Sequence, residues 1–336
     1  MQTHYPRYLQ ITLAQWRSRE AVARQMLSAC RLCPRACRAD RLNGEHGFCR
    51  SGGAAEISHW QIHHGEEPPL SEQGGAGTIF FTHCNLSCIF CQNYQISQAR
   101  EAGRRMEAEE LASIMLDLQR QGAQNIDLVS PTHMVPQIIA AVAAAARQGL
   151  TIPLVYNSNG YDAQETLALL DGIVDIYLPD LKYAQEESAQ RYSAVSDYVR
   201  HARAAVRSMY RQVGGLRCDA SGRALSGLLV RHLVLPGHTA ESIAILRFLQ
   251  ENIGADAGLS VMSQYAPRAQ AFGDAVLNRP LSASEYAAVL AAAEHAGFHQ
   301  SWMQELDSSE IYFPDFAEDE VFLTERPPAR PRDAAG

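Results

Sequence analysis

Three cysteines lie within eight residues of this chain, in the stretch FFTHCNLSCIFCQNYQIS at residues 80–97. They are Cys84, Cys88 and Cys91, spaced C-x3-C-x2-C. A structural zinc site needs four ligands, so zinc would require a further group such as His83. A cubane iron–sulfur cluster also has four metal corners, each normally held by a cysteine. Three cysteines would therefore leave one iron open to bind a substrate or cofactor directly.

A second group of cysteines precedes this loop and has one more member. Cys30, Cys33, Cys37 and Cys49 are spaced C-x2-C-x3-C-x11-C in a glycine-bearing segment. Four thiolates can close a metal site completely, and both zinc and a second [4Fe–4S] cluster fit this number. A second cluster would relay electrons or lie near the substrate. A disulfide framework is the third alternative, and the sequence does not separate the two metals.

Charge and composition argue against a nucleic-acid-binding, membrane-spanning or secreted protein. The 336-residue chain has a formal net charge of −8, which argues against a nucleic-acid partner, although a local basic patch can coexist with it. No run of about 18 uncharged apolar residues occurs, so no membrane span is expected. The N-terminal MQTHYPRYLQ lacks the pattern of a secretory signal. We therefore predict a cytoplasmic protein, in which clustered cysteines more often bind metal than form disulfides.

The elements that position the cysteines alternate between strand-like and helix-like patterns. Apolar runs typical of buried strands occupy residues 78–83, 125–130, 151–158, 174–180, 227–236 and 259–265. Helical spacing follows each run, over residues 107–122, 136–149, 165–172, 188–213, 241–254 and 283–297, and an earlier helix is expected over 13–27. Six strand–helix units predict a parallel sheet, either an open doubly wound sheet or an incomplete barrel. In both, the site lies at the carboxyl ends of the strands, where the three-cysteine loop falls.

The same pattern suggests three parts of the chain. Residues 1–77 form a leader and a four-cysteine metal-binding lobe, since so short and glycine-rich a segment needs a metal to be stable. Residues 78–310 form the strand–helix domain. Residues 311–336 form a C-terminal tail whose Pro-, Arg- and Ala-rich end is predicted to be disordered.

The three-cysteine loop, with Phe90 directly before its last cysteine, resembles that of the radical S-adenosylmethionine (SAM) superfamily. The resemblance implies an α/β fold with a partial (β/α)6 TIM-like barrel. It also implies a [4Fe–4S] cluster whose open iron chelates SAM through the amino and carboxylate groups. One electron then cleaves the sulfonium C–S bond, and the resulting 5′-deoxyadenosyl radical abstracts a hydrogen atom from the substrate.

Further strings narrow the resemblance to one branch of this superfamily. CNLSCIFCQN is similar to the cysteine loop of glycyl-radical-enzyme activases, typified by pyruvate formate-lyase activating enzyme. The strings GEEPPLSEQGGAGTIFF, VSPTH, LPDLKY, RHLVLPG and MSQYAP look like a poorly characterised, activase-like branch. The similarity extends from about residue 30 to residue 302.

The resemblance also implies which residues contact the cofactor. Phe90 and Gln92 belong to the loop, and the other candidates stand at strand ends: Ser130, Thr132, Asn157, Ser158, Asp180, Lys182 and Arg231. The family's Gly-Gly-Glu turn is absent here, so Ser130 and Thr132 or nearby carbonyls would accept the hydrogen bonds of the SAM ammonium. A family histidine near the sixth strand is also absent, and Gln264 or Tyr265 stands in that region.

These observations favour a radical SAM enzyme that abstracts hydrogen, and the activase-like strings suggest a glycine or peptide of a partner protein as its target. The resemblance implies an electron donor such as flavodoxin or ferredoxin. One alternative is an iron–sulfur electron-transfer or scaffold protein, although such a protein usually caps all four irons with protein ligands. Another keeps the radical chemistry and acts on a small molecule or RNA.

Overall fold

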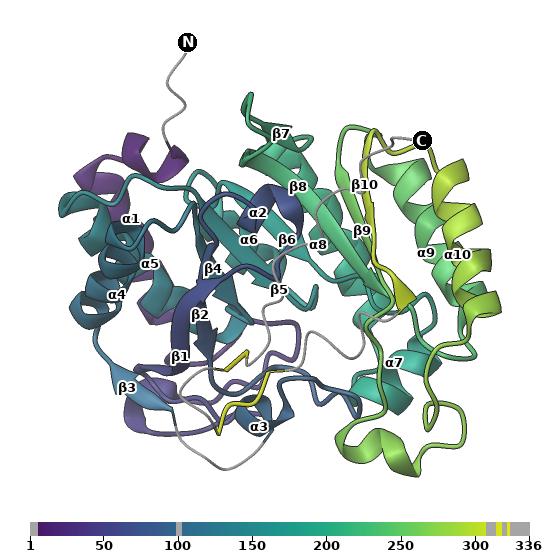
Figure 1. Ribbon diagram of the computed structural model, residues 1–336. Helices are drawn as coiled ribbons and strands as arrows, with labels where there is room; N and C mark the ends of the chain where they lie inside the picture. The colour runs from purple at the N-terminus through teal and green to yellow at the C-terminus, as the bar shows by residue number, and fades with distance from the viewer. Residues whose placement is uncertain (1–5, 99–102, 307–313, 318–320, 323–336) are drawn as a thin grey trace.

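Parallel strands form the centre of the sheet in the computed structural model, which describes residues 6–98, 103–306, 314–317 and 321–322 (Figure 1). All six predicted strands are present: β2 (Ala76–Phe81), β4 (Ile126–Val129), β5 (Leu154–Ser158), β6 (Ile176–Pro179), β8 (Ala224–Leu233) and β9 (Gly258–Met262). They are neighbours in this order, and each pair is parallel. The mixed α/β class and the mostly parallel open sheet are confirmed, and the curved sheet is consistent with a partial barrel.

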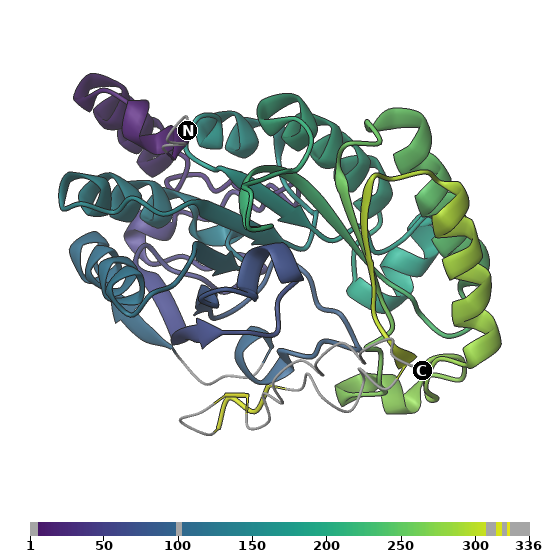
Figure 2. The same cartoon turned by 45° about the horizontal axis from the view of Figure 1, so that its top comes forward.

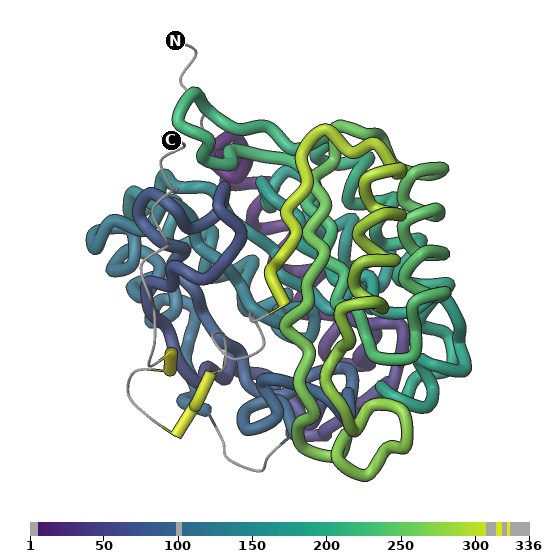
Figure 3. Tube along the Cα trace, turned by 45° about the vertical axis from the view of Figure 1, so that its right-hand side comes forward, coloured from purple at the N-terminus to yellow at the C-terminus, as the bar shows by residue number. Residues whose placement is uncertain are grey.

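Four strands extend the sheet beyond the predicted six. β1 (Ala55–His63) pairs antiparallel with β2, and β3 (Arg104–Met106) pairs antiparallel with β1. β10 (Gln300–Met303) adds a further parallel strand beside β9, as Figure 3 shows, and β7 (Arg217–Cys218) pairs antiparallel with β8. Because β1 belongs to this sheet, residues 55–63 are continuous with the strand–helix domain.

Helices cover the convex outer side of the sheet, and one short helix lies on its inner side (Figure 2). The outer helices are α1 (Leu13–Gln25), α4 (Ala108–Arg120), α5 (Val135–Arg147), α6 (Gln164–Leu170), α8 (Tyr198–Val213), α9 (Thr239–Asn252) and α10 (Ala283–His295). The inner helix is α2 (Pro68–Ser71); α3 (Tyr94–Ser97) follows the cysteine loop and α7 (Glu186–Ser193) follows β6. Short 3-10 turns are η1 (Arg7–Gln10), η2 (Arg41–Asn43), η3 (Thr132–Met134) and η4 (Ala269–Gly273).

The helix predicted over residues 188–213 is wrong, because the chain forms two helices there. α7 ends at Ser193, and Ala194 adopts a left-handed conformation with φ 54° before α8 begins. The sequence holds no glycine or proline at this break. Tertiary hydrogen bonds hold the turn instead, since Ser193 O accepts from Ser87 N and Ala194 O accepts from Arg35 Nη2 at 2.8 Å.

Alternation along the strands separates an outer core from an inner face. In β5, Leu154 and Tyr156 pack in the main core under the helices. Val155 belongs to a second cluster that includes Leu70 of α2 and Leu229 of β8. Successive side chains of a strand point to opposite faces. The short helix α2 therefore fills part of the inner side with apolar atoms, and the inner face turns polar towards the carboxyl ends of the strands.

Some predictions on organisation remain untested. The domain boundaries at residues 77 and 310 stay predictions, and most of the predicted tail at 311–336 lies outside the described residues. Within that segment, Phe316 packs against Phe80 of β2 with ring centroids 5.3 Å apart. No helix in the described part of the chain is long and apolar enough to cross a membrane.

Candidate metal centre and cofactor site

The three-cysteine loop begins directly beyond the carboxyl end of β2. His83, which precedes the first cysteine, adopts a left-handed φ of 68°, an uncommon conformation for a residue with a side chain. Its Nε2 lies 2.8 Å from Glu56 Oε2. The histidine that could have completed a zinc site therefore contacts a carboxylate of β1 through this nitrogen.

Backbone N–H groups point at the sulfur atoms of this loop. Leu86 N–H donates to Cys84 Sγ at 3.4 Å, and the backbone of Asn93 donates to Cys91. Hydrogen bonds of this kind stabilise thiolates and are characteristic of the surroundings of iron–sulfur ligands. The loop conformation therefore fits cysteines that act as metal ligands.

A polar side chain also contacts each of the three sulfur atoms. The three contacts are Asn159 Nδ2 to Cys84 Sγ at 3.3 Å, Ser193 Oγ to Cys88 Sγ at 2.9 Å, and Ser97 Oγ with Cys91 Sγ at 3.2 Å. These partners come from three different segments of the chain. The sequence missed all of them. Asn159 had a weak signal because it stands in YNSNGY beside two predicted contacts, whereas Ser97 and Ser193 had none.

Burial makes these thiols poor acids in the absence of a cation. Burial, together with the neighbouring Cys88, raises the pKa of Cys84 to about 12 and that of Cys91 to about 11. The thiols of Cys84 and Cys91 therefore each interact electrostatically with Cys88. A buried thiol releases its proton readily only when a positive centre compensates the charge. The donor set and its burial therefore fit the [4Fe–4S] cluster implied by the sequence.

No three His, Cys, Asp or Glu side chains come close enough together to hold one metal ion, as far as the described residues go. The fit of the loop to an iron–sulfur cluster thus rests on the number, burial and hydrogen bonding of its thiols.

Asp180 and Lys182 lie close to the cysteine loop, as the sequence predicted for a cofactor-contacting pair. Lys182 Nζ and Asp180 Oδ2 are 2.5 Å apart, and both side chains are largely buried. Burial lowers the pKa of Lys182, but the negative charges of Asp180, Cys88 and Tyr198 together raise it by more, so the ammonium stays charged. Burial is the largest influence on the pKa of Cys88 and raises it. The positive charge of Lys182 is the second largest influence and lowers this pKa. A positive charge therefore stands beside the cysteine loop.

The predicted contacts on β4 and β5 divide into two sets. The hydroxyls of Thr132 and Ser158 donate to the buried carboxylate of Asp162, at 2.8 and 2.7 Å. Their hydroxyls are therefore engaged in the core. Ser130 is partly exposed and has a left-handed φ of 57° at the end of β4, where its N–H donates to Asn157 O. Strained backbone of this kind is frequent at functional sites, which keeps Ser130 a candidate.

Asn157 and Arg231 project to the inner side of the sheet. Asn157 Nδ2 donates to Asp127 Oδ2 at 3.2 Å. Arg231 forms ion pairs with Glu66 and Glu67, and its Nε lies 2.7 Å from Glu67 Oε1. Two carboxylates near α2 therefore offset the charge of the guanidinium, which the resemblance placed among the cofactor contacts. A role for Arg231 in SAM binding stays a prediction that would require this network to rearrange.

The segment after β9 contacts the cysteine loop. Gln92 Nε2 donates to Gln264 O at 3.1 Å, and Gln264 Nε2 lies 3.4 Å from Gln92 Oε1. Phe90 packs edge-on against Tyr265 with centroids 6.0 Å apart. Gln264 and Tyr265 thus occupy the vicinity of the loop, which is where the family pattern has its histidine.

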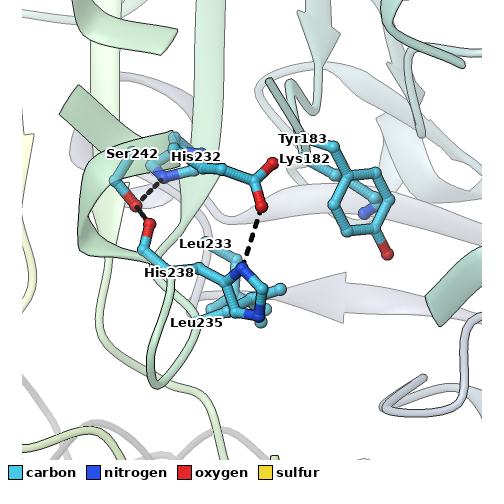
Figure 4. A pocket seen from close by; sticks show the side chains of 8 residues that line it. Lys182, Tyr183, His232, Leu233, Leu235, His238 and Ser242 are labelled. Atoms are coloured by element: carbon cyan, nitrogen blue, oxygen red, sulfur yellow. Dashed lines mark hydrogen bonds and ion pairs between the residues drawn. The ribbon is translucent and has the colours of Figure 1, made fainter. Parts of the chain in front are cut away.

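A shallow pocket beside Lys182 contains two histidines that the sequence did not single out (Figure 4). His238 lies 2.8 Å from Glu241 Oε1 and 3.0 Å from the hydroxyl of Tyr192. His232 contacts the carbonyl of Leu181 and the hydroxyl of Ser242, both at 2.8 Å, and burial lowers its pKa to about 4. His238 therefore joins α7 to the start of α9, and His232 joins β8 to α9 and to the segment after β6.

The four cysteines of the N-terminal lobe also group together. Burial, with smaller contributions from Cys49, Cys30 and Cys37, raises the pKa of Cys33 to about 12. Arg41 Nη1 lies 4.0 Å from Cys30 Sγ and donates to the carbonyl of residue 133 at 2.8 Å. This segment therefore carries four cysteines, and Cys33 interacts electrostatically with the other three. Their number fits either zinc or a cluster.

Arg35 joins the lobe to the three-cysteine loop. Its backbone N–H donates to Cys33, while its Nε donates to Asn85 O at 2.6 Å. Asn85 follows Cys84 directly, so one residue bridges the two cysteine groups. The Arg35 guanidinium also lies 3.4 Å above the ring centre of Phe48. The lobe thus packs at the edge of the sheet where the loop lies.

Comparison with known proteins assigns the class. The family model of the radical SAM superfamily matches residues 78–249. The uncharacterized protein MJ0674 of Methanocaldococcus jannaschii is 30% identical over 282 residues, which cover 81% of this chain and 76% of that protein. The chain therefore belongs to the radical SAM superfamily, whose members use a [4Fe–4S] cluster and SAM.

Solved structures show weaker likenesses. Methylornithine synthase (PylB) is 14% identical with a TM-score of 0.46, over 96% of this chain and 86% of that chain. SuiB of Streptococcus suis bound to S-adenosylmethionine is 12% identical with a TM-score of 0.46, over 70% of this chain and 48% of that chain. A domain of pyruvate-formate lyase-activating enzyme from Bacteroides vulgatus is 12% identical with a TM-score of 0.37, over 51% of this chain and 92% of that domain. The chain spans about half the length of SuiB.

Proposed function

We propose that this protein is an activase-like oxidoreductase of the radical SAM superfamily, which abstracts hydrogen from a glycine or peptide site of a partner protein. Cys84, Cys88 and Cys91 would hold the [4Fe–4S] cluster. One observation carries the proposal: three hydrogen-bonded thiols, one buried and two partly buried, stand at the carboxyl edge of the sheet beside the Asp180–Lys182 ion pair.

The residues of the chain would bind and orient the cofactor. A [4Fe–4S] cluster with an open iron supplies the chelation of SAM and the electron for its reductive cleavage. Lys182 offers a charge-assisted donor to the SAM carboxylate, and Asp180 keeps that ammonium charged. Ser130 offers a hydroxyl and a strand-end carbonyl to the SAM ammonium. Phe90 and Gln92 would border the cofactor from the loop.

The choice of a protein or peptide target rests on the activase-like string CNLSCIFCQN. An activase also needs a one-electron donor, and flavodoxin or ferredoxin supplies electrons of this kind. Both partners are expected to bind at the open edge, because the carboxyl ends of the strands meet there.

The test is SAM cleavage by the anaerobically reconstituted, reduced protein. We expect 5′-deoxyadenosine and methionine, formed slowly without a target and faster with a glycyl radical enzyme, whose radical is detected by electron paramagnetic resonance (EPR). Cys218→Ala is the matched control, since Cys218 lies outside both groups and contacts Gln300. A fully loaded, fully reduced protein that never cleaves SAM would instead support an electron carrier.

For the N-terminal lobe we propose a closed metal site formed by Cys30, Cys33, Cys37 and Cys49. Metal analysis of the full-length protein with Cys84, Cys88 and Cys91 all replaced by alanine identifies the ion. One zinc per chain supports a structural lobe, whereas four irons with sulfide support a second cluster. A protein that retains neither metal contradicts the proposal.

A further inference from the structure

The carboxyl end of α7 forms hydrogen bonds with the cysteine loop on both sides of Cys88. Ser87 N–H donates to Ser193 O at 3.2 Å, and Ile89 N–H donates to Tyr192 O at 2.9 Å. Between these two backbone bonds, Ser193 Oγ donates to Cys88 Sγ at 2.9 Å. Three hydrogen bonds from two consecutive residues therefore fix both the backbone and the sulfur of this cysteine.

The hydroxyl of Ser193 itself has a hydrogen-bond partner, the hydroxyl of Tyr183. Tyr183 OH lies 2.6 Å from Ser193 Oγ, and both side chains are buried. A serine hydroxyl has one proton to donate. Since that proton is directed at the Cys88 sulfur, the oxygen of Ser193 accepts from Tyr183. The result is a directional chain, from Tyr183 through Ser193 to Cys88, in which each hydrogen bond polarises the next.

We propose that Ser193 is a positioning residue that sets the reduction potential of the cluster held by Cys84, Cys88 and Cys91. The inference rests on the proposed function, because it requires a cluster at these cysteines. Hydrogen bonds to the sulfurs are among the factors that set the potential of an iron–sulfur cluster. A donor at the sulfur stabilises the reduced state more than the oxidised state, because the reduced state places more negative charge on its ligands.

Ser193 stands apart from the other two side-chain donors. Its contact is the shortest of the three, at 2.9 Å against 3.3 Å for Asn159 and 3.2 Å for Ser97. Ser193 is also the last residue of α7, directly before Ala194, whose left-handed conformation ends the helix. The donor is thus placed by tertiary structure and cannot easily turn away from the sulfur. Its effect is to make the cluster easier to reduce by a physiological electron donor.

The experiment is a dye-mediated redox titration of the reconstituted full-length protein, followed by EPR, with iron counted in each sample. For Ser193→Ala we expect four irons and about a tenfold lower ratio of reduced to oxidised cluster at a fixed potential. For one electron this corresponds to a midpoint about 59 mV lower. Tyr183→Phe should shift the midpoint in the same direction by less. Ser208→Ala should leave it unchanged, since that buried serine of α8 contacts Gln164.

The outcomes separate the inference from the proposed function. If Ser193→Ala holds four irons at the wild-type midpoint, the inference is overturned. If Ser193→Ala loads no iron, the Tyr183→Phe variant tests the inference in its place. An unchanged midpoint potential in Tyr183→Phe then also overturns the inference. Recovery of the midpoint in Ser193→Thr supports it, because the hydroxyl returns. A wild-type protein that holds no cluster at the three-cysteine loop would refute the proposed function before any titration.

Discussion

The three-cysteine loop and the four-cysteine lobe both contain thiols that accept hydrogen bonds from backbone N–H groups, but their surroundings differ. The loop has an ion pair beside it and polar strand ends above it, whereas the lobe has four cysteines and few other polar groups directed at them. The difference teaches that two sites with the same kind of donor can serve opposite purposes. A closed set of four ligands stabilises a fold, and an open set of three leaves room for a cofactor.

The two regions also depend on the rest of the chain to different degrees. Gln264 after β9, Ser193 of α7 and Asn159 after β5 all contact the loop. Arg35 and Arg41 tie the lobe to the rest of the chain, and Leu32 O accepts from Thr166 Oγ1. The proposed metal would add to the stability of this segment. A change in the packing of the sheet is therefore expected to alter the loop, whereas the lobe can unfold while the loop stays intact.

The largest expected effect is the loss of chemistry at the loop. Cys88→Ala should abolish SAM cleavage and remove most of the iron, because two thiols cannot retain a cubane cluster. The metal of the lobe should remain, since none of its ligands is changed. Iron, zinc and 5′-deoxyadenosine are measured in the same sample. If Cys88→Ala also empties the lobe, the two regions are not independent and the comparison fails.

Replacement of one ligand in the lobe should act on stability. Cys33→Ser is expected to release the lobe metal and to destabilise this segment by several kcal/mol, since metal binding supplies its folding free energy. The loop cluster should still load and SAM should still be cleaved. Limited proteolysis within residues 30–50 and thermal unfolding follow the change. An unchanged proteolysis pattern with the metal lost would show that the lobe folds without it.

Substitution of Arg35 removes the hydrogen bonds that join the four-cysteine lobe to the three-cysteine loop. Arg35→Ala removes the hydrogen bonds to Asn85 O and Ala194 O, which should cost about 2 kcal/mol in the free energy of unfolding. Arg31→Ala is the matched control. Its exposed ion pair with Glu165 is expected to contribute about 0.5 kcal/mol. Urea unfolding measures both, and equal effects of the two variants would contradict a specific bridge.

The ion pair beside the loop should affect the cofactor and spare the cluster. Lys182→Met is expected to weaken SAM binding about tenfold, the loss of about 1.4 kcal/mol from one charge-assisted contact. Iron content should match the wild type. Equilibrium binding of SAM to the oxidised, loaded protein gives the affinity. Unchanged affinity would remove Lys182 from the cofactor site, whereas loss of iron would assign it to the support of the loop.

The smallest effect concerns a buried histidine between the two regions. Burial lowers the pKa of His133 to about 3, and its Nε2 lies 2.8 Å from the carbonyl of Thr82, just before the loop. The unfolded chain takes up this proton below about pH 6.5 and the folded chain does not. Stability must therefore fall as the pH falls, by about 0.8 kcal/mol between pH 8 and pH 6.

His133→Gln tests this prediction, because glutamine retains an N–H donor for the Thr82 carbonyl but does not titrate. The difference in unfolding free energy between pH 8 and pH 6 should shrink by about 0.8 kcal/mol in this variant. An unchanged difference would mean that His133 is already neutral in the unfolded chain or charged in the folded one.

Much of the fold could be predicted from the sequence, because each strand carries its own periodicity. The six parallel strands were predicted from short apolar runs, and α4 and α5 from apolar residues at helical spacing. β1 was missed, since its pairing with β2 depends on a neighbour in space more than on its own pattern. The break between α7 and α8 was missed because no glycine or proline marks it.

The sequence by itself predicted the three cluster ligands and the class of chemistry, since three thiols on a short loop would leave one iron open wherever the loop lies. Only the tertiary structure decided what surrounds those thiols. It turned Thr132 and Ser158 towards Asp162, engaged Arg231 with two glutamates, and brought Ser193 to the sulfur of Cys88. The physical reason is that ligand number is a local property of the chain. Charge compensation and hydrogen bonding depend on segments that meet only when the sheet has formed.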